Sequence, residues 1–380
     1  MTGSVSRAVP PEIDTPSNVE PLFRRARLGK LTVANRIMMS PMTRSFSPDG
    51  VPREDVAAYY ARRAAGGVGL IVTEGIGINH PTAIDDPAMP HLYGRPALDG
   101  WKCVVKAVHA AGGLILAQLW HQGPLRNHAI SLRPDLIGSR PSGLWGTPGV
   151  VSYGRDYIES VITESAPMSV AEIDDVIAAY ASAARSAIDL GFDGVEIHGA
   201  HGYLIDSFLW GDTNRRTDRF GGGIRERTAF AVDVVRATRN AIGKDPMVMF
   251  RYSQHKQQDY KARLAHTPSE LSELLEPLAA SGIDAFDVSG RRFWEKAFSE
   301  SDLTLAGWTK KITGLPTVAV GSVGLVPDGS PEAAGLRIAS GEFDMIGVGR
   351  SVLHNPNWAE KVRRGVKPDP SDPSSLDRLL

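Results

Sequence analysis

The sequence predicts an α/β protein: one (β/α)₈ TIM barrel with an N-terminal hairpin and a long loop after the third strand. Eight short runs of apolar and β-branched residues recur along the 380-residue chain. Longer stretches with apolar residues at helical spacing separate these runs. The runs are apolar almost throughout, as in parallel strands that are covered on both faces. Eight strand–helix units over this length favour a closed barrel.

The expected strands lie, in chain order, at residues 37–43, 70–76, 114–120, 194–200, 248–253, 285–290, 317–322 and 345–349. Amphipathic helices are expected at 170–190, 226–242 and 268–282. The first of them places on one face Ile173, Val176, Ile177 and Tyr180, and Gly191 can end it. The competing fold is an open doubly wound sheet. That fold would need a Gly-rich turn after an early strand, whereas GGVGL (66–70) precedes a strand.

Two segments fall outside the repeating pattern. Residues 22–36 read as a short hairpin that plugs the bottom of the barrel, and residues 122–168 form a loop long enough to be a lid or binding loop. We expect residues 1–20 to be a flexible N-terminal tail, residues 21–365 to be the single barrel domain, and residues 366–380 to be a C-terminal tail. The stretch after Trp358 lacks aromatic residues, so we expect little contribution to a pocket from it.

Composition limits the classes of function. A net charge of −1 argues against a nucleic-acid-binding surface, which requires a strongly basic domain. No apolar run reaches the ~20 residues of a membrane span, and the first 20 residues lack the apolar core of a signal peptide, so we expect a cytoplasmic protein. Cys103 is the single cysteine, which excludes an internal disulfide. Its helical surroundings predict a small buried thiol.

The chemistry of a barrel is expected at the carboxyl ends of its strands. Those ends carry Pro41, Met42, Thr43, Glu74, Gly75, Gln118, Leu119, Trp120, His198, His201, Arg251, Ser289, Gly290, Gly321, Ser322, Gly349 and Arg350. This set is suited to a flat heteroaromatic ligand that has many hydrogen-bonding edges and a phosphate. It contains a hydroxyl, an amide, two imidazoles, an arginine and several glycines.

The phosphate is expected in the turns after the seventh and eighth strands, where barrels often bind one. Gly321, Gly347 and Gly349 would let the backbone approach closely, and Arg350 could grip phosphate oxygens with its planar fork. On glycines alone, simple tight turns explain the pattern equally well.

The segment HGAHGYLIDSFL (198–209) follows a buried strand directly. His198 and His201 could be metal ligands, but no third ligand is evident at a strand end. Two hydrogen-bond donors to a substrate oxygen fit better. Tyr203 could then donate a proton, since a phenol with a reference pKa of ~10 can protonate a carbanion or enolate. An ordinary polar loop anchored by a tyrosine is the alternative.

Three more side chains complete the candidate site. Gln118 and Trp120 alternate with Leu119 and so share one strand face. The amide of Gln118 could pair with an imide edge, or it could be a core glutamine satisfied by the backbone. Arg251 ends its strand, and a buried arginine needs an acceptor or anion.

Taken together, these motifs resemble the old yellow enzymes, a family of NADH:flavin oxidoreductases. The resemblance runs from about Pro21 to Trp358 and rests on five segments in order: NRIMMSPMTR (35–44), QLWHQG (118–123), HGAHGYLIDSFL (198–209), NRRTDRFGG (214–222) and GVGR (347–350). It departs from the family after position 222, where the family usually has Ser and then Glu-Asn-Arg.

The resemblance implies FMN as cofactor and NADH or NADPH as electron donor. Pro41, Met42 and Thr43 would meet the flavin ring, with the threonine hydroxyl near O4 and Gly75 alongside the ring. Gln118 would pair with the pyrimidine edge and Arg251 would face the N1–O2 end. Gly321, Ser322, Gly349 and Arg350 would hold the phosphate. Thr43 places the chain with the threonine-bearing branch, because some members carry cysteine there.

The resemblance also implies a reaction, the reduction of an electron-poor alkene such as an enone or nitroalkene. His198 and His201 would polarise its electron-withdrawing group, hydride would pass from flavin N5 to the β-carbon, and Tyr203 would protonate the α-carbon. Trp120 would form a wall of the substrate pocket. Two alternatives remain: a barrel lyase or aldolase acting on a phosphorylated substrate, which needs a catalytic lysine or metal carboxylates, and a flavin-binding protein without catalysis.

Overall fold

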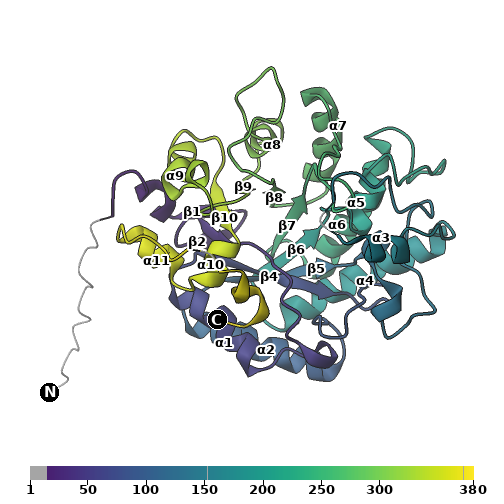
Figure 1. Cartoon of the computed structure of the whole chain (residues 1–380), viewed down its shortest axis with the longest axis horizontal. Helices are drawn as coiled ribbons and strands as arrows, with labels where there is room; N and C mark the ends of the chain where they lie inside the picture. The colour runs from purple at the N-terminus through teal and green to yellow at the C-terminus, as the bar shows by residue number, and fades with distance from the viewer. Residues whose placement is uncertain (1–14, 152, 371) are drawn as a thin grey trace.

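The computed structural model describes residues 15–151, 153–370 and 372–380. Eight parallel strands close into a barrel in the order β10-β3-β4-β5-β6-β7-β8-β9 (Figure 1). These strands are β3 Ile37–Met39, β4 Leu70–Gly77, β5 Ile115–Trp120, β6 Gly194–His198, β7 Met247–Tyr252, β8 Ala285–Ser289, β9 Thr317–Val320 and β10 Met345–Val348. Each lies within a residue of its expected start, which confirms the TIM barrel.

Helices surround the barrel and cover its outer face (Figure 1). The main ones are α1 Glu54–Ala65, α2 Arg95–Ala110, α4 Val170–Asp189, α6 Ala229–Ile242, α7 Pro268–Ala279, α8 Leu305–Thr313 and α9 Pro331–Ala339. Helix α4 begins with a capping box between Ser169 and Glu172 and ends just before Gly191, whose φ of 95° favours glycine. The expected helix at 226–242 begins with a 3₁₀ turn, Glu226–Thr228, before α6.

The N-terminal hairpin plugs the barrel as expected. Strands β1 Ala26–Leu28 and β2 Leu31–Val33 pair antiparallel. Leu28 and Val33 are fully buried in one apolar cluster with side chains from the lower halves of the barrel strands, among them Met38, Leu116 and Met249. Because this end of the barrel is closed by apolar packing, ligands can reach the interior only from the carboxyl ends of the strands.

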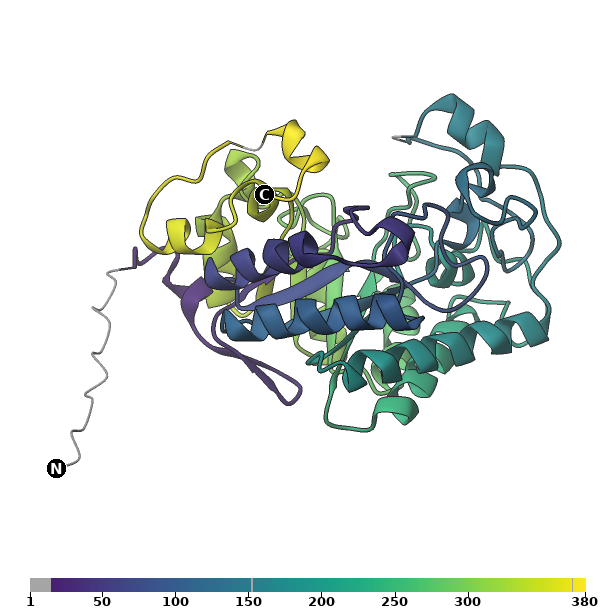
Figure 2. The ribbon, with the colours of Figure 1, turned by 90° about the horizontal axis from the view of Figure 1, so that it is seen from below.

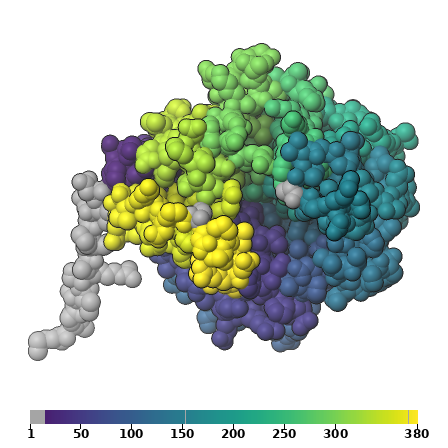
Figure 3. Space-filling model, viewed as in Figure 1, coloured from purple at the N-terminus to yellow at the C-terminus, as the bar shows by residue number. Residues whose placement is uncertain are grey.

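Two long segments stand on that carboxyl-end side. The 122–168 loop contains a short helix, α3 Arg155–Val161, and the chain's last part contains α10 Arg350–His354 and α11 Trp358–Arg363. Figure 2 shows both segments on the same side of the barrel, opposite the hairpin. The space-filling view shows a hollow between them (Figure 3). The loop and the C-terminal segment therefore wall the entrance to the strand ends.

The C-terminal segment is attached to the first strand turn. The Arg44 guanidinium donates to the carbonyls of Ser375 (3.1 Å) and Arg378 (2.8 Å), and Arg63 donates to Leu353 (2.7 Å). Residues 1–14 of the expected N-terminal tail lie outside the described residues. Within the described ranges, no helix is long and apolar enough to cross a membrane.

The expectation of a buried thiol at Cys103 is wrong, because its side chain is exposed. The buried face of α2 is formed by Trp101, Val104, Val105 and Val108. Cys103 follows Trp101 by two residues, which is about 200° around a helix, so it points to the opposite side.

Candidate functional site

Two adjoining cavities open at the carboxyl ends of the strands, and together they gather almost every predicted site residue. The first, about 200 Å³, is lined by Pro41, Thr43, Gln118, Trp120, His198, His201, Tyr203, Arg251 and Gln257. The second, about 290 Å³, is lined by Ser40, Pro41, Met42, Arg251, His255, Gly290, Arg291, Val320, Gly321, Ser322, Val323, Leu325, Gly347, Gly349 and Arg350. They share Pro41 and Arg251, so we treat them as one elongated site with an imidazole end and an arginine end.

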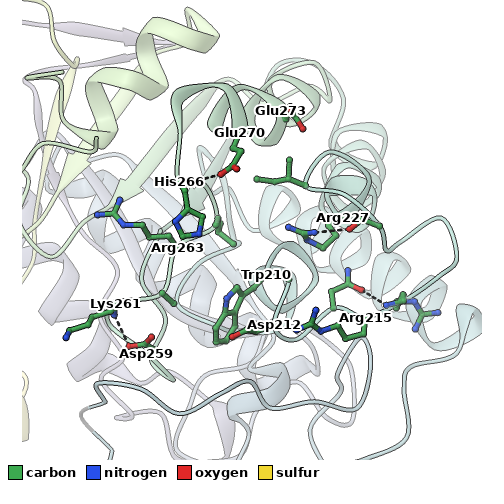
Figure 4. A pocket seen from close by; sticks show the side chains of 17 residues that line it. Trp210, Asp212, Arg215, Arg227, Asp259, Lys261, Arg263, His266, Glu270 and Glu273 are labelled. Carbon is green, nitrogen blue, oxygen red and sulfur yellow. Dashed lines mark hydrogen bonds and ion pairs between the residues drawn. The ribbon is translucent and has the colours of Figure 1, made fainter. Parts of the chain in front are cut away.

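A larger groove of about 900 Å³ lies elsewhere, beside Trp210 and the 259–273 segment (Figure 4). Its arginines already have partners in the chain. Arg227 donates to the carbonyls of Leu209 and Gly222, and Arg263 donates to that of Ala297. None of the predicted site residues lines it, so its size alone does not make it the candidate site.

His198 and His201 stand at the imidazole end with their rings 5.3 Å apart and nearly perpendicular. The Nδ1 atom of His198 accepts the backbone N–H of Ala200 at 3.4 Å, which places the ring proton on Nε2. His201 Nε2 bonds the Ser289 hydroxyl at 2.8 Å. If Ser289 donates in that bond, His201 Nδ1 carries the free N–H. Each ring then has one donor left for a ligand.

Both imidazoles are neutral at physiological pH. Burial lowers the pKa of His198 well below its usual value, and the positive charge of Arg251 lowers it further. Burial also lowers the pKa of His201, with His255, Arg251, His198 and Lys256 adding to the effect. A neutral pair can donate hydrogen bonds to a carbonyl or nitro oxygen without the cost of burying two cations.

His201 is held in an unusual backbone conformation. Its φ of 66° lies in the left-handed region, which non-glycine residues rarely adopt. Its N–H donates to Ser253 (3.0 Å), and the following Gly202 has no room for a side chain, because a Cβ there would lie 1.8 Å from Gln258 Oε1. Among the described residues, Ser322 is one of three other non-glycine residues with positive φ, and it was also predicted in the site. Such strain concentrates at functional sites.

Tyr203 reaches the same cavity from the start of α5, Leu204–Leu209. Its ring meets Trp120 edge-on at 5.0 Å and His198 at 5.0 Å. Burial raises its pKa well above the usual value, and its hydroxyl interacts with that of Tyr153. Tyr153 and the neighbouring Tyr157 come from the 122–168 loop, which packs an apolar cluster against Tyr203. The loop therefore shapes the surroundings of the candidate proton donor.

Gly75 is the predicted site residue that lines neither cavity. The position that its Cβ would occupy lies 2.5 Å from the ring of Trp120, so any larger residue would displace that ring. Trp120 is buried and stacks near His198, with the ring centroids 6.3 Å apart. Packing against Trp120 is thus sufficient reason for glycine at position 75.

Gln118 and Arg251 each have an acidic partner inside the barrel. Gln118 Nε2 donates to Glu196 Oε1 at 2.7 Å, so Gln118 is satisfied by a side chain rather than by the backbone. Arg251 forms an ion pair with Asp287 and donates to Ser289 Oγ at 3.2 Å. Asp287 and Ser289 therefore supply some of the acceptors that the buried Arg251 guanidinium needs.

The arginine end fits a phosphate group. Gly321 and Gly349 line it, with no side chain between their backbone and the cavity, and Arg291 and Arg350 both border it. Within the described ranges, neither guanidinium has an ion-pair partner, although Arg291 lies over the Tyr260 ring at 4.0 Å. Two guanidinium groups without an ion-pair partner, beside backbone lined by glycine, are suited to bind an anion.

The geometry supports neither a lyase or aldolase that uses a catalytic lysine nor a site that binds a metal ion. Lys256 lies close to the site, but its Nζ is fully buried and donates to Asp206 (2.8 Å) and to the carbonyl of Ser253 (3.2 Å). It has no access to a substrate carbonyl. In the part of the chain that the structure describes, no group of three or more His, Cys, Asp or Glu side chains could hold a metal ion.

Sequence reasoning missed Glu196, Asp287, Arg291 and His255. Glu196 and Asp287 could have been recognised from the sequence, because each is an acidic residue inside an otherwise apolar strand. Glu196 lies in GVEIHG and Asp287 lies in AFDVSG. His255 lies on the turn after β7, with its ring 5.1 Å from His201, and burial is the main cause that lowers its pKa to about 3. Nothing local distinguishes His255 or Arg291 from surface residues.

The donor set matches what FMN needs. An elongated site offers an amide and a buried arginine at its middle and two unpaired arginines with open glycine backbone at one end. The Nε–H of Arg251 is buried without a partner among the described residues, so one charged donor there is still available. An isoalloxazine ring has acceptors for the amide and arginine, and the phosphate suits the arginine end.

Comparisons with known proteins agree with this fit. The model of the NADH:flavin oxidoreductase / NADH oxidase family matches residues 21–369. Flavin oxidoreductase hxnT of Emericella nidulans is 31% identical over 374 residues, which cover 92% of each protein. The chain spans only about half the length of two other curated relatives, an NADH oxidase of Thermoanaerobacter brockii (51%) and a metal reductase of Desulforamulus reducens (49%).

Solved structures give the same result. Morphinone reductase in complex with tetrahydroNAD superimposes with a TM-score of 0.79 at 27% identity, covering 93% of both chains. The old yellow enzyme homologue of Zymomonas mobilis has a TM-score of 0.79 at 29% identity, covering 93% of this chain and 96% of its own. The chain therefore belongs to the NADH:flavin oxidoreductase / NADH oxidase family, the old yellow enzymes, and is an oxidoreductase that uses FMN with NAD(P)H as electron donor.

Proposed function

We propose that this protein reduces activated carbon–carbon double bonds of electron-poor alkenes such as enones and nitroalkenes. One observation carries the proposal: His198, His201, Tyr203 and Trp120 converge on a single cavity that also shares Pro41 and Arg251 with the arginine end. Two neutral donors, one phenol and an aromatic wall are what an enone needs beside a hydride donor. Bound FMN would supply the hydride, with NAD(P)H as its source.

The residues that would hold FMN follow from the cavity linings. Pro41, Met42 and Thr43 border the middle of the site, with Thr43 on the imidazole side. Gln118 would pair with the pyrimidine edge, and Arg251 would stabilise negative charge at the N1–O2 end. In this proposal Gly75 lies alongside the ring only through its backbone, because Trp120 fills its side-chain position.

The phosphate would bind at the other end. Gly321, Ser322, Gly349 and Arg350 form that end of the lining, and we add Arg291 to the predicted set. The strained φ of 55° at Ser322 turns the backbone between Gly321 and Val323. Its hydroxyl already donates to the carbonyl of Arg291 at 2.9 Å, so backbone N–H groups and guanidinium groups would make the phosphate contacts.

The protein's own groups would then direct the acceptor. His198 Nε2–H and His201 Nδ1–H would donate to the carbonyl or nitro oxygen, which withdraws electrons from the double bond and makes its β-carbon electrophilic. Tyr203 would give its hydroxyl proton to the α-carbon. Burial raises the pKa of Tyr203 well above its usual value and the interaction with Tyr153 raises it further, so the phenol carries its proton at neutral pH and has it available for transfer.

Separate measurement of the two half-reactions tests this assignment. Reduction of the protein by NAD(P)H needs no proton from Tyr203, whereas enone reduction does. Tyr203→Phe should leave the first half-reaction nearly intact and slow the second by about 10²–10⁴-fold, the usual contribution of a positioned general acid. Nitroalkenes, whose carbanion is stable, should be slowed less.

Stopped-flow absorbance follows both steps in one instrument. Tyr157→Phe is the matched control, because this tyrosine lies in the same cluster but donates to the carbonyl of Leu125 (2.6 Å). Equal slowing of both half-reactions by Tyr203→Phe, or an unchanged rate with enones, would remove Tyr203 from the mechanism. A colourless protein that takes up no added FMN would remove the proposal altogether.

A further inference from the structure

A buried polar layer lies inside the barrel directly beneath the site. It consists of Gln118 on β5, Glu196 on β6, Arg251 on β7 and Asp287 on β8, four consecutive strands of the barrel. None of these residues is more than 4% exposed. The apolar cluster of the hairpin plug closes the barrel below them. Solvent therefore screens the charges in this layer only weakly.

Two carboxyl oxygen atoms of the layer receive no hydrogen bond from within it. Glu196 Oε1 accepts from Gln118, and Asp287 Oδ2 accepts from Arg251. Glu196 Oε2 and Asp287 Oδ1 have no donor among the described residues. The Asp287 side chain raises the pKa of Glu196 both by its charge and as a hydrogen-bonding group, so the two carboxyl groups lie within reach of each other. Two ionised carboxylates this near to each other would repel, whereas one shared proton would supply the donor that both oxygens lack.

The charges of the layer lead to the same conclusion. Arg251 supplies one positive charge and the two carboxyl groups supply up to two negative charges. With one proton on the carboxyl pair the layer is neutral, and without it a net negative charge is buried at high cost. Burial raises the pKa of Glu196 well above its usual value, and the charge of Asp287 raises it further, while Arg251 and the bond from Gln118 oppose this.

We propose that Glu196 is a protonated acid that shares its hydrogen with Asp287, and that this pair positions Gln118 and Arg251 for FMN. The inference rests on the proposed FMN site. Glu196 takes one N–H of Gln118, which leaves the other N–H and the Oε1 atom of that amide for the flavin edge. Asp287 fixes the guanidinium and compensates part of its charge, which limits how strongly Arg251 stabilises an anionic reduced flavin.

Infrared spectroscopy of the apoprotein tests the protonation state without any flavin. The spectrum should contain a carboxylic acid C=O band that shifts in D₂O and disappears in Glu196→Gln. Glu74 is a second buried carboxyl, with a pKa raised to about 7. The spectra are therefore compared at about pH 9, where Glu74 is ionised, and Glu74→Gln serves as the matched control that leaves the band in place. A band at this pH that survives Glu196→Gln, or no band at all, overturns the proposal.

The flavin midpoint potential of the holoprotein tests the influence on FMN. Glu196→Gln exchanges one neutral group for another, so the potential at neutral pH should stay close to that of the wild type. Asp287→Asn made in the Glu196→Gln background, where no carboxyl can replace the lost charge, removes the counter-charge of Arg251 and should make the potential more positive by at least about 30 mV, a tenfold change for a two-electron couple. An equal rise in both variants would mean that Glu196 is ionised, and no rise in the double variant would mean that the layer does not act on the flavin.

Each variant has an independent check. If the double variant does not fold, the infrared band and the potential of the isosteric Glu196→Gln variant still decide the protonation state. Failure of the wild-type protein to bind FMN would refute the proposed function but would leave the infrared result standing. The two ideas therefore fail in different experiments.

Discussion

Glu74 should make the protein less stable as pH rises through the neutral range, and Glu74→Gln should remove that effect. The side chain is 1% exposed on β4. Its Oε2 atom accepts the backbone N–H groups of Arg44 (2.8 Å) and Ser45 (3.1 Å), which fixes the turn directly after Thr43. Burial raises its pKa from 4.5 to about 7, and the bonds from Arg44 and Ser45 only partly oppose this.

The magnitude follows from linkage. Between pH 4.5 and 7 the folded state holds a proton at Glu74 that the unfolded chain has released, so stability falls as pH rises. A shift of about 2.5 pKa units at about 1.36 kcal/mol each amounts to about 3 kcal/mol, which is fully lost above pH 7. For 380 residues, this corresponds to a change of about 4 °C in Tm.

Glutamine keeps the acceptor oxygen for Arg44 and Ser45 but carries no charge. Tm is measured for the wild type and for Glu74→Gln from pH 4 to pH 8.5. As pH rises, the Tm of the variant should increase relative to that of the wild type, by about 4 °C in total. Glu172→Gln is the control with the opposite sign, because hydrogen bonds from Ser169 lower the pKa of Glu172. A difference between wild type and Glu74→Gln that stays flat with pH, or runs the other way, would refute the argument.

Three further predictions concern the site and its support. Arg350→Ala should weaken FMN binding far more than riboflavin binding in equilibrium dialysis, with exposed Arg364→Ala as control; equal losses would make Arg350 structural. Lys256→Met leaves the fully buried Asp206 carboxylate unpaired and should cost about 3–5 kcal/mol in denaturant unfolding, of which Asp206→Asn in the same chain should recover part; a cost below about 1 kcal/mol would contradict the buried pair. His198→Ala combined with His201→Ala should abolish the charge-transfer band of a bound phenol while FMN is retained, and a persisting band, or activity lost to a chelator, would count against paired donors.

Much of this protein can be predicted from local sequence. The eight strands and the helices α4, α6 and α7 begin where the hydrophobic period changes, because the backbone geometry of each element imposes its own spacing on buried residues. The strand ends could be identified as the site because parallel strands in a closed barrel must all end on the same side. His198, Tyr203, Arg251 and Arg350 were predicted in this way without any contact information, and all four line the two cavities.

Other features depend on contacts between distant segments. Cys103 lies outside the core because neighbouring helices and strands select which face of α2 is buried. Tyr153 reaches Tyr203 only through the path of the 122–168 loop, and a loop's path is set by what it packs against rather than by its own period. Local patterns along the chain are enough to predict the barrel, its strand ends and the residue types at the site. The proximity of the Glu196 and Asp287 carboxyl groups comes from barrel closure, which brings together side chains that are 91 residues apart, and no local pattern encodes that distance.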